Sequence, residues 1–178
     1  GWHVAFRRVP EAMARILPIS GTAMLVVLAM RMSRYGWCHP SGGDAGTFWF
    51  KQLWLTPSFW MMRSIVYITL WSLLSWRIVA KSRNQDFTDK VRSRAGNQRL
   101  SAMFLAVYAV TFSLASIDWL MALDPLWFST IWGVYNFAGM MQASLAVVIM
   151  LGLLLRSHAG PLAGVFRDEH LHDLGKLL

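Results

Sequence analysis

Two opposite charges lie inside apolar stretches of this sequence, and their positions make them candidates for chemistry. Arg63 lies in the apolar stretch 58–79, and Asp118 lies in the apolar stretch 100–123. A charge at bilayer depth costs about 2.5–3.5 kcal/mol on the insertion scale, so each of them requires a compensating partner. A carboxylate in such a place also suits a proton acceptor. These two residues are therefore the first candidates for a functional site.

The depths of the two charges can be compared along the helices that would carry them. At 1.5 Å per residue, Arg63 lies about 9 Å from the outer end of its segment and Asp118 lies about 8 Å from the same side. The equal heights predict an ion pair or a shared polar pocket near the outer face. The alternative is that Arg63 extends to the outer headgroups while Asp118 caps a neighbouring helix.

The elements that must position these charges are membrane helices. The chain has 178 residues, of which 56% are hydrophobic, and its apolar residues form stretches long enough to cross a bilayer. We predict an all-α polytopic membrane helical bundle in which 1–178 is one membrane domain, with a further helix beginning in 164–178. Both ends interrupt predicted segments, which favours part of a longer protein. The four predicted transmembrane helices are 16–32, 58–79, 100–123 and 131–155.

Basic residues predict the orientation of these helices. The formal net charge is +8, and the connection 77–99 carries seven Lys or Arg against two Asp. The positive-inside rule assigns this connection to the cytoplasm. The N-terminus, the 80–99 loop and the C-terminal tail are then cytoplasmic, and anionic lipid headgroups account for the basic charge without nucleic acid.

Cysteine and histidine limit the cofactors that this chain could hold. Its single cysteine, Cys38, excludes an iron–sulfur cluster and a CxxCH haem attachment within the chain. All five histidines lie outside the apolar stretches, so we expect neither haem ligation nor a metal site. Any redox centre must then belong to a partner.

Aromatic residues gather at the predicted membrane boundaries, where they indicate an aromatic belt. Trp127 and Phe128 fit either this belt or the entrance of a quinone headgroup. Tyr67 follows Arg63 by one turn, and Tyr135 lies on the polar side of the fourth segment. The tryptophans assigned to the belt are Trp37, Trp49, Trp54, Trp60, Trp76, Trp119, Trp127 and Trp132.

Three stretches carry a resemblance to a known family. Residues 116–131, 59–71 and 168–176 resemble the second quinone-binding subunit of alternative complex III, and the likeness runs through most of the chain from Lys51 onward. That subunit belongs to the NrfD-like, polysulfide-reductase-type membrane proteins, which are helical bundles. The most specific of the three stretches, 116–131, reads SIDWLMALDPLWFSTI.

The resemblance implies a bacterial inner-membrane subunit of a quinol-oxidising complex. Partner subunits would carry iron–sulfur clusters and c-type haems beside a second NrfD-like subunit, and menaquinone or ubiquinone would be the quinone. Asp118 would be the buried carboxylate, Arg63 its partner and Asp124 the acid at the outer rim. His172 and Asp173 would open the next helix as proton-transfer candidates.

Quinone contacts are expected from Tyr67, Trp127, Phe128 and Tyr135. The sequence departs from the family pattern at Leu126, where the family usually has His, and at Asp124, where it usually has Glu. Two alternatives stay open: a structural membrane anchor for redox subunits, and a subunit that translocates protons or ions.

Overall fold

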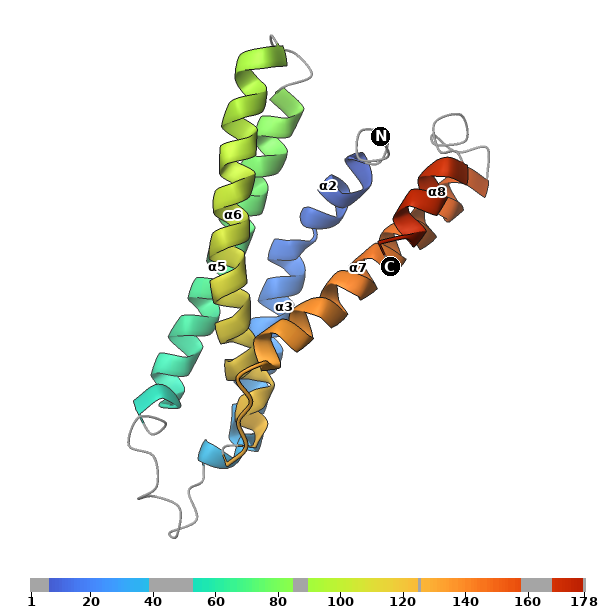
Figure 1. Ribbon diagram of the computed structural model, residues 1–178. Helices are drawn as coiled ribbons and strands as arrows, with labels where there is room; N and C mark the ends of the chain where they lie inside the picture. The colour runs from blue at the N-terminus through green and yellow to red at the C-terminus, as the bar shows by residue number, and fades with distance from the viewer. Residues whose placement is uncertain (1–6, 39–52, 85–89, 125, 158–167, 178) are drawn as a thin grey trace. The chain divides into compact units, whose positions relative to one another are not determined.

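The described residues of the chain are helical and contain no strand, so the predicted all-α class is confirmed for them. Helix labels follow Figure 1. The computed structural model describes residues 7–38, 53–84, 90–124, 126–157 and 168–177.

Six α-helices and three short 3-10 turns make up this part of the chain. Proline occupies the first turn of α3 and the first position of α5, where its missing N–H is tolerated. The 3-10 turns are η1 (Met32–Arg34), η2 (Gly36–Cys38) and η3 (Met121–Leu123). The α-helices are α2 (Arg8–Ala14), α3 (Leu17–Arg31), α5 (Pro57–Asn84), α6 (Lys90–Trp119), α7 (Trp132–Ser157) and α8 (Asp168–Gly175).

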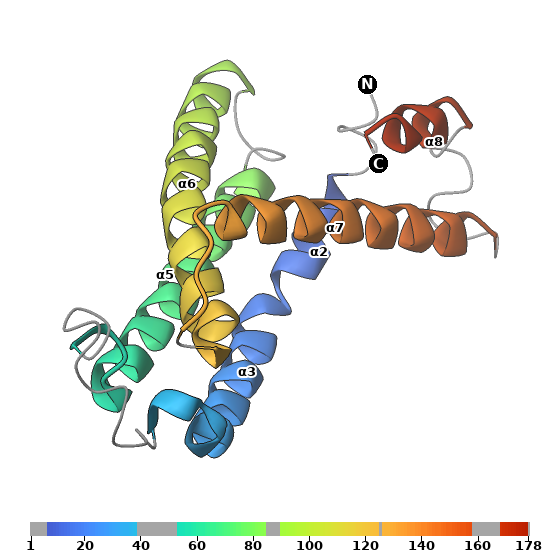
Figure 2. The same ribbon diagram turned by 60° about the horizontal axis from the view of Figure 1, so that its bottom comes forward.

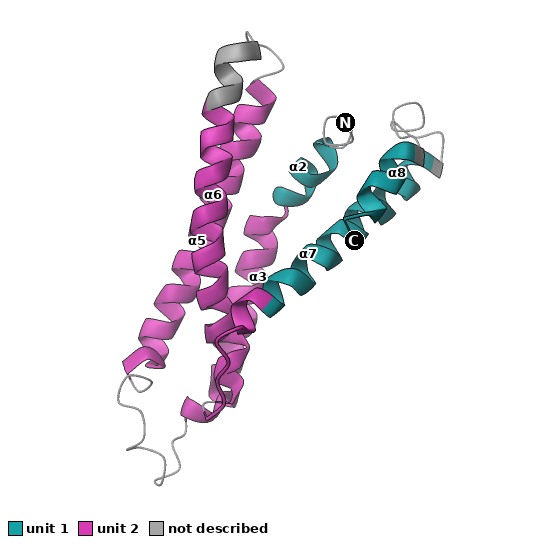
Figure 3. Cartoon of the chain, in the orientation of Figure 1, with its two compact units in different colours: residues 1–15, 135–178 teal, residues 16–134 magenta. Residues whose placement is uncertain are grey.

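The chain divides into two compact units, which Figure 3 distinguishes by colour. One unit is Ile16–Val134 and holds α3, α5, α6 and the first residues of α7. The other combines Gly1–Arg15 with Tyr135–Leu178 and holds α2, most of α7 and α8. We refer to them by the figure's names, unit 2 and unit 1 respectively.

Three stretches of the described chain are long and apolar enough to cross a membrane, which supports the predicted membrane character. They overlap the predicted segments 16–32, 100–123 and 131–155. The three stretches are Arg8–Arg34, Gly96–Leu123 and Trp132–Arg156.

The predicted segment 58–79 is not among these stretches, although α5, which contains it, has 28 residues. Its composition is the reason. Arg63 and Arg77 are charged, and serine recurs along the helix at 64, 72 and 75. Length and apolar composition alone therefore yield three membrane-crossing helices instead of the four that we predicted.

Unit 2 is built around α5, which packs against both α3 and α6. Figures 1 and 2 show α5 and α6 side by side and antiparallel. Their shared core consists of Tyr67, Ile68 and Trp71 from α5 with Ala115 from α6. Trp71 contacts several rings in this core, including Tyr108 with ring centroids 5.2 Å apart.

A second core in unit 2 lies at the end where α5 begins. Leu28, Tyr35, Trp60 and Ala122 of η3 are buried together there, with partly buried neighbours that include residues of η1 and η2. The short 3-10 turns thus close this end of the helices with aromatic and aliphatic side chains.

Unit 1 has a small apolar core of its own. Leu174 of α8 is fully buried against Val9 of α2 and Val148 of α7. α8 lies within the predicted stretch 164–178, and its leucines attach it to α2 and α7. Its polar residues His172 and Asp173 are exposed.

α3 approaches α5 closely at a glycine. A Cβ added at Gly21 would lie 2.5 Å from Cγ2 of Ile68. A real Cβ does not tolerate that distance, so one helix would have to shift. In contrast, a Cβ added at Gly139 meets no described atom within 4 Å.

This contrast predicts opposite effects of the same substitution. Gly21→Ala should destabilise the protein by about 1–2 kcal/mol because it overpacks the contact between α3 and α5. Gly139→Ala is the matched control and should stabilise by up to about 1 kcal/mol, since alanine favours helix over glycine. Unfolding titrations in mixed detergent micelles measure both. Equal stabilisation by the two variants would contradict the close approach.

Candidate functional site

Arg63 of α5 and Asp118 of α6 form an ion pair inside unit 2. Arg63 Nη2 donates to Asp118 Oδ1 at 2.8 Å, and Arg63 Nε donates to Oδ2 at 2.9 Å. The side chain of Asp118 is fully buried, and Arg63 is 8% exposed. Two parallel hydrogen bonds between guanidinium and carboxylate are the strongest form of such a pair. The sequence predicted a pair at equal depth, and the structure contains it.

Two further side chains donate to the carboxylate of Asp118. Trp54 Nε1 donates to Oδ1 at 2.8 Å, and the Tyr67 hydroxyl donates to Oδ2 at 3.0 Å. Each carboxylate oxygen therefore accepts two hydrogen bonds, which uses its lone pairs. We call Trp54, Arg63, Tyr67 and Asp118 the charge cluster.

Arg63 also has interactions that do not involve Asp118. Its Nη1 donates to the backbone carbonyl of Trp54 at 2.8 Å. Its guanidinium carbon lies 4.0 Å from the ring centroid of Trp54 and 4.4 Å from that of Phe59. A cation over aromatic faces is stabilised by their quadrupoles, by about 2 kcal/mol or more where water is excluded. The guanidinium thus has acceptors on several sides.

The C-terminal end of α6 is held by side chains from other elements. The last carbonyls of a helix have no partner within it. Trp60 Nε1 donates to the backbone carbonyl of Asp118 at 2.8 Å, and the Tyr35 hydroxyl donates to that of Trp119 at 3.0 Å. Burial, and next the negative charge of Asp118, raise the pKa of Tyr35, so its hydroxyl stays protonated as a donor at neutral pH.

A serine on α5 joins two of these tryptophans. Trp119 Nε1 donates to Ser64 Oγ at 2.9 Å, and Ser64 Oγ donates to the carbonyl of Trp60 at 3.0 Å. Ser64 is fully buried. Two turns further along α5, Trp71 Nε1 donates to Thr111 Oγ1 at 2.8 Å. These tryptophan N–H groups between α5 and α6 therefore each have a hydroxyl acceptor.

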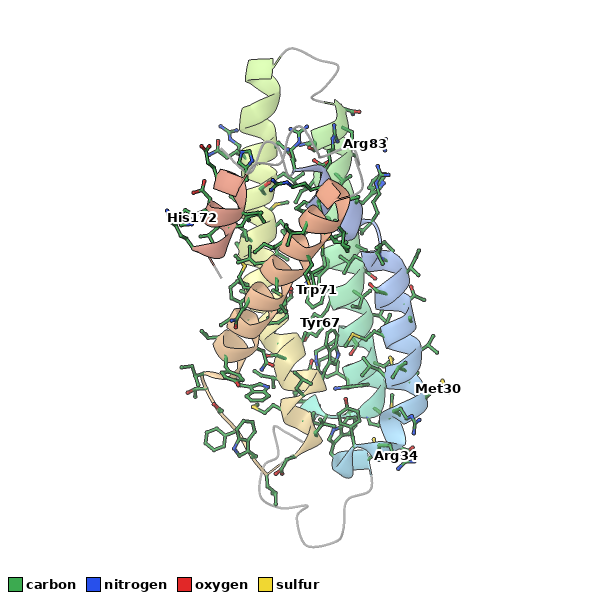
Figure 4. The ribbon with its side chains drawn as sticks, turned by 90° about the vertical axis from the view of Figure 1, so that its right-hand side faces the viewer. Met30, Arg34, Tyr67, Trp71, Arg83 and His172 are labelled. Atoms are coloured by element: carbon green, nitrogen blue, oxygen red, sulfur yellow. The ribbon has the colours of Figure 1, made fainter. Side chains whose placement is uncertain are left out.

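Among the described residues of unit 2, five tryptophans donate their indole N–H to specific acceptors in the protein: Trp54, Trp60, Trp71, Trp119 and Trp132. All of these except Trp71 are among the residues assigned to the boundary belt. The assignment of Trp60 to a lipid-facing belt was wrong, because Trp60 is fully buried and its indole N–H donates to the backbone carbonyl of Asp118 near the end of α6. Figure 4 shows Tyr67 and Trp71 one turn apart on α5.

The spacing of Trp60, Ser64, Tyr67 and Trp71 was a usable signal in the sequence. Steps of three and four residues place them on one helical face. Trp54 offered no such signal, because it lies in the segment before α5 and no helical period fixes its position.

The other predicted site residues lie outside the charge cluster. Asp124 is exposed, and its Oδ1 accepts a hydrogen bond from the backbone N–H of Leu126 at 3.1 Å. Trp127 is 45% exposed and Phe128 is 69% exposed. Tyr135 belongs to unit 1 and is 69% exposed.

The predicted quinone contacts and proton-transfer residues can be compared with the place of each residue in the structure. Of the four predicted quinone contacts, Tyr67 alone lies in the charge cluster, and its hydroxyl already donates to Asp118. His172 and Asp173 lie on α8 in unit 1. The described residues include no group of three or more His, Cys, Asp or Glu arranged to hold a metal ion.

Comparisons with known proteins return no family model and no curated protein that matches this chain. The function must therefore be argued from the residues and their geometry.

The buried pair predicts a large penalty when one partner is removed. Asp118→Asn should destabilise the protein by about 3–5 kcal/mol, because it leaves a buried guanidinium without its counter-charge. Replacing both partners, in Arg63→Met/Asp118→Leu, should cost less than Asp118→Asn, since apolar side chains of similar volume leave no buried charge. Chemical unfolding in mixed micelles measures these differences.

Asp124→Asn serves as the control for the loss of one carboxylate. It should leave stability unchanged, because Asp124 is exposed. A double variant less stable than Asp118→Asn would contradict the account of the pair.

Proposed function

We propose that this chain is a four-span membrane subunit of a quinol-oxidising electron-transfer complex of the alternative complex III type. In this proposal α5 is the fourth membrane-crossing helix beside the three apolar stretches. Iron–sulfur and c-type cytochrome subunits and a second NrfD-like subunit are its partners in a bacterial inner membrane. The chain itself contributes a quinone or proton-transfer site near the outer face.

The arrangement of residues around α5 supports a membrane crossing. Its buried side carries Arg63, Ser64 and Ser75, whereas Val66 and Leu73 are about half exposed. A water-soluble helix has the opposite arrangement, with its polar side chains outward. Polar groups turned toward protein and apolar groups turned outward suit a helix in lipid. Basic residues at the end of α5 and in the connection to α6 suit a cytoplasmic side.

The single observation that carries the quinol hypothesis is the fully buried Asp118 in the stretch that resembles the quinone-binding subunit. The segment after it, in the same stretch, exposes the aromatic rings of Trp127 and Phe128. A quinol that gives up its two electrons to a partner's redox centre must also release two protons. Trp127 and Phe128 would hold the quinol ring, Asp118 would accept one of the two protons, and the other would pass to water at the outer face.

The geometry of Arg63 supports such a role for Asp118. A proton on Asp118 requires that one of its four donors withdraws, since both oxygens are fully engaged. Arg63 would retain the Trp54 carbonyl and two aromatic rings after its carboxylate partner is neutralised. The carboxylate can therefore change charge while the guanidinium keeps most of its environment.

A second function, a structural anchor for redox subunits, is favoured by a different observation. The four hydrogen bonds to Asp118 join α5, α6 and the segment before α5. This arrangement suits a fixed ion pair that holds helices in register. In that case the chain positions its partners and Asp118 handles no proton.

Quinol turnover of the complex purified from native membranes separates the two functions. If Asp118 accepts the proton, Asp118→Asn and Arg63→Met/Asp118→Leu should each lower turnover per assembled complex by about 10²–10⁴-fold, the usual contribution of a positioned base. Turnover is measured with a soluble quinol analogue, and assembly is measured by gel filtration.

Glu169→Gln is the control for removing a carboxylate from this chain, since Glu169 is exposed on α8. It should leave turnover unchanged. If the assembled double variant turns over at the normal rate, Asp118 has no part in the chemistry and the anchor function is correct.

A further inference from the structure

The outward side of α5 changes character along its length. Between Met62 and Trp76 this side exposes apolar side chains together with one threonine, Thr69. Beyond Trp76 the same side exposes two cations, Arg77 and Lys81. The exposed large apolar residues and their exposed fractions are Met62 52%, Ile65 48%, Val66 46%, Leu73 50% and Trp76 66%.

These residues form one continuous stripe. Val66, Leu73, Arg77 and Lys81 follow one another at steps of seven and four residues, which return to the same helical face. The apolar part of the stripe runs from Met62 to Trp76, a rise of about 21 Å, and its section from Val66 to Trp76 rises about 15 Å. The length of that section equals half of the hydrocarbon thickness of a bilayer, about 30 Å, and thus one leaflet.

The cations at the end of the stripe have no counter-charge among the described residues. Neither Arg77 nor Lys81 forms an ion pair with another described residue. No Asp or Glu occurs in 70–84 or 96–110, the described parts of α5 and α6 near this end. Figure 4 marks this end of unit 2 by Arg83 and the opposite end by Arg34.

Trp76 lies between the apolar part of the stripe and the cations. An indole ring combines an apolar body with one N–H donor, and tryptophan is enriched at the level of lipid headgroups for that reason. With Trp76 at this level, Lys81 lies about 7 Å further out, at the depth of the phosphates. The stripe thus has an apolar part at least as long as one leaflet and a cationic end at headgroup height.

We propose that this stripe binds an anionic phospholipid, with an acyl chain along Val66 and Leu73 and the phosphate between Arg77 and Lys81. The apolar part is at least as long as one leaflet and ends in cations at headgroup height, which favours a lipid over a protein partner. The two cations, which have no acidic partner among the described residues, favour an anionic headgroup over a zwitterionic one. The inference rests on α5 crossing the membrane, as proposed above, and not on quinol oxidation.

The test uses the full-length protein in detergent with added phosphatidylglycerol or phosphatidylcholine. Thermal unfolding reports stabilisation, and native mass spectrometry reports bound lipid. Phosphatidylglycerol should bind more tightly and raise the unfolding temperature more than phosphatidylcholine. Arg77→Gln/Lys81→Gln should weaken its binding about thirtyfold, as expected for the loss of two cations near an anionic headgroup.

The matched control is Arg31→Gln/Arg34→Gln, which removes two exposed cations at the opposite end of unit 2. It should leave phosphatidylglycerol binding unchanged. If the first double variant does not fold, Lys81→Gln alone replaces it and should weaken binding about fivefold.

Three results would overturn the proposal. Equal binding of the two lipids would show that the headgroup charge is not recognised. Equal losses in the two double variants would show diffuse attraction in place of a site. Binding of inorganic phosphate or glycerol phosphate as tight as that of the lipid would remove the role of the apolar stripe. None of these measurements involves quinol, so their outcome is independent of turnover.

Discussion

An ion pair sealed between two helices constrains the whole of unit 2. A guanidinium or a carboxylate buried alone would cost several kcal/mol, so α5 and α6 are stable together only where Arg63 meets Asp118. That register also brings Trp60 to the free carbonyl at the end of α6 and Ser64 to the indole of Trp119. The register of α5 and α6 that pairs the two charges therefore also positions Trp60 and Trp119.

The same register determines what α5 turns outward. Once its polar side chains face α6, the remaining surface is apolar along at least one leaflet's length and cationic at one end. The mean hydropathy of α5 mixes these two sides, and no stretch of α5 is apolar enough to be among the three membrane-crossing candidates. Averaged over its whole circumference, α5 is therefore less apolar than a membrane-crossing stretch. Its exposed surface alone resembles that of a lipid-facing helix.

Regular geometry explains which parts could be predicted from the sequence. The rise per residue of a helix is fixed, so the common depth of Arg63 and Asp118 followed from segment ends alone, as did the helical class. Trp54 could not be predicted, because its place depends on how the chain folds back before α5. Trp60 was misassigned because the abundance of tryptophan at membrane boundaries outweighed its three-to-four-residue spacing with Ser64 and Tyr67.

If the ion pair were broken, Arg63 and Asp118 would keep different interactions with their other neighbours. Arg63 has a carbonyl and two aromatic rings as alternative neighbours. Asp118 would keep the Trp54 and Tyr67 donors, and once protonated it is a neutral group that tolerates burial. The five N–H donors of a buried guanidinium exceed what one carboxylate accepts, so either role of Asp118 requires further partners for Arg63. In the proton-transfer proposal, these partners would keep Arg63 in place while the charge of Asp118 changes.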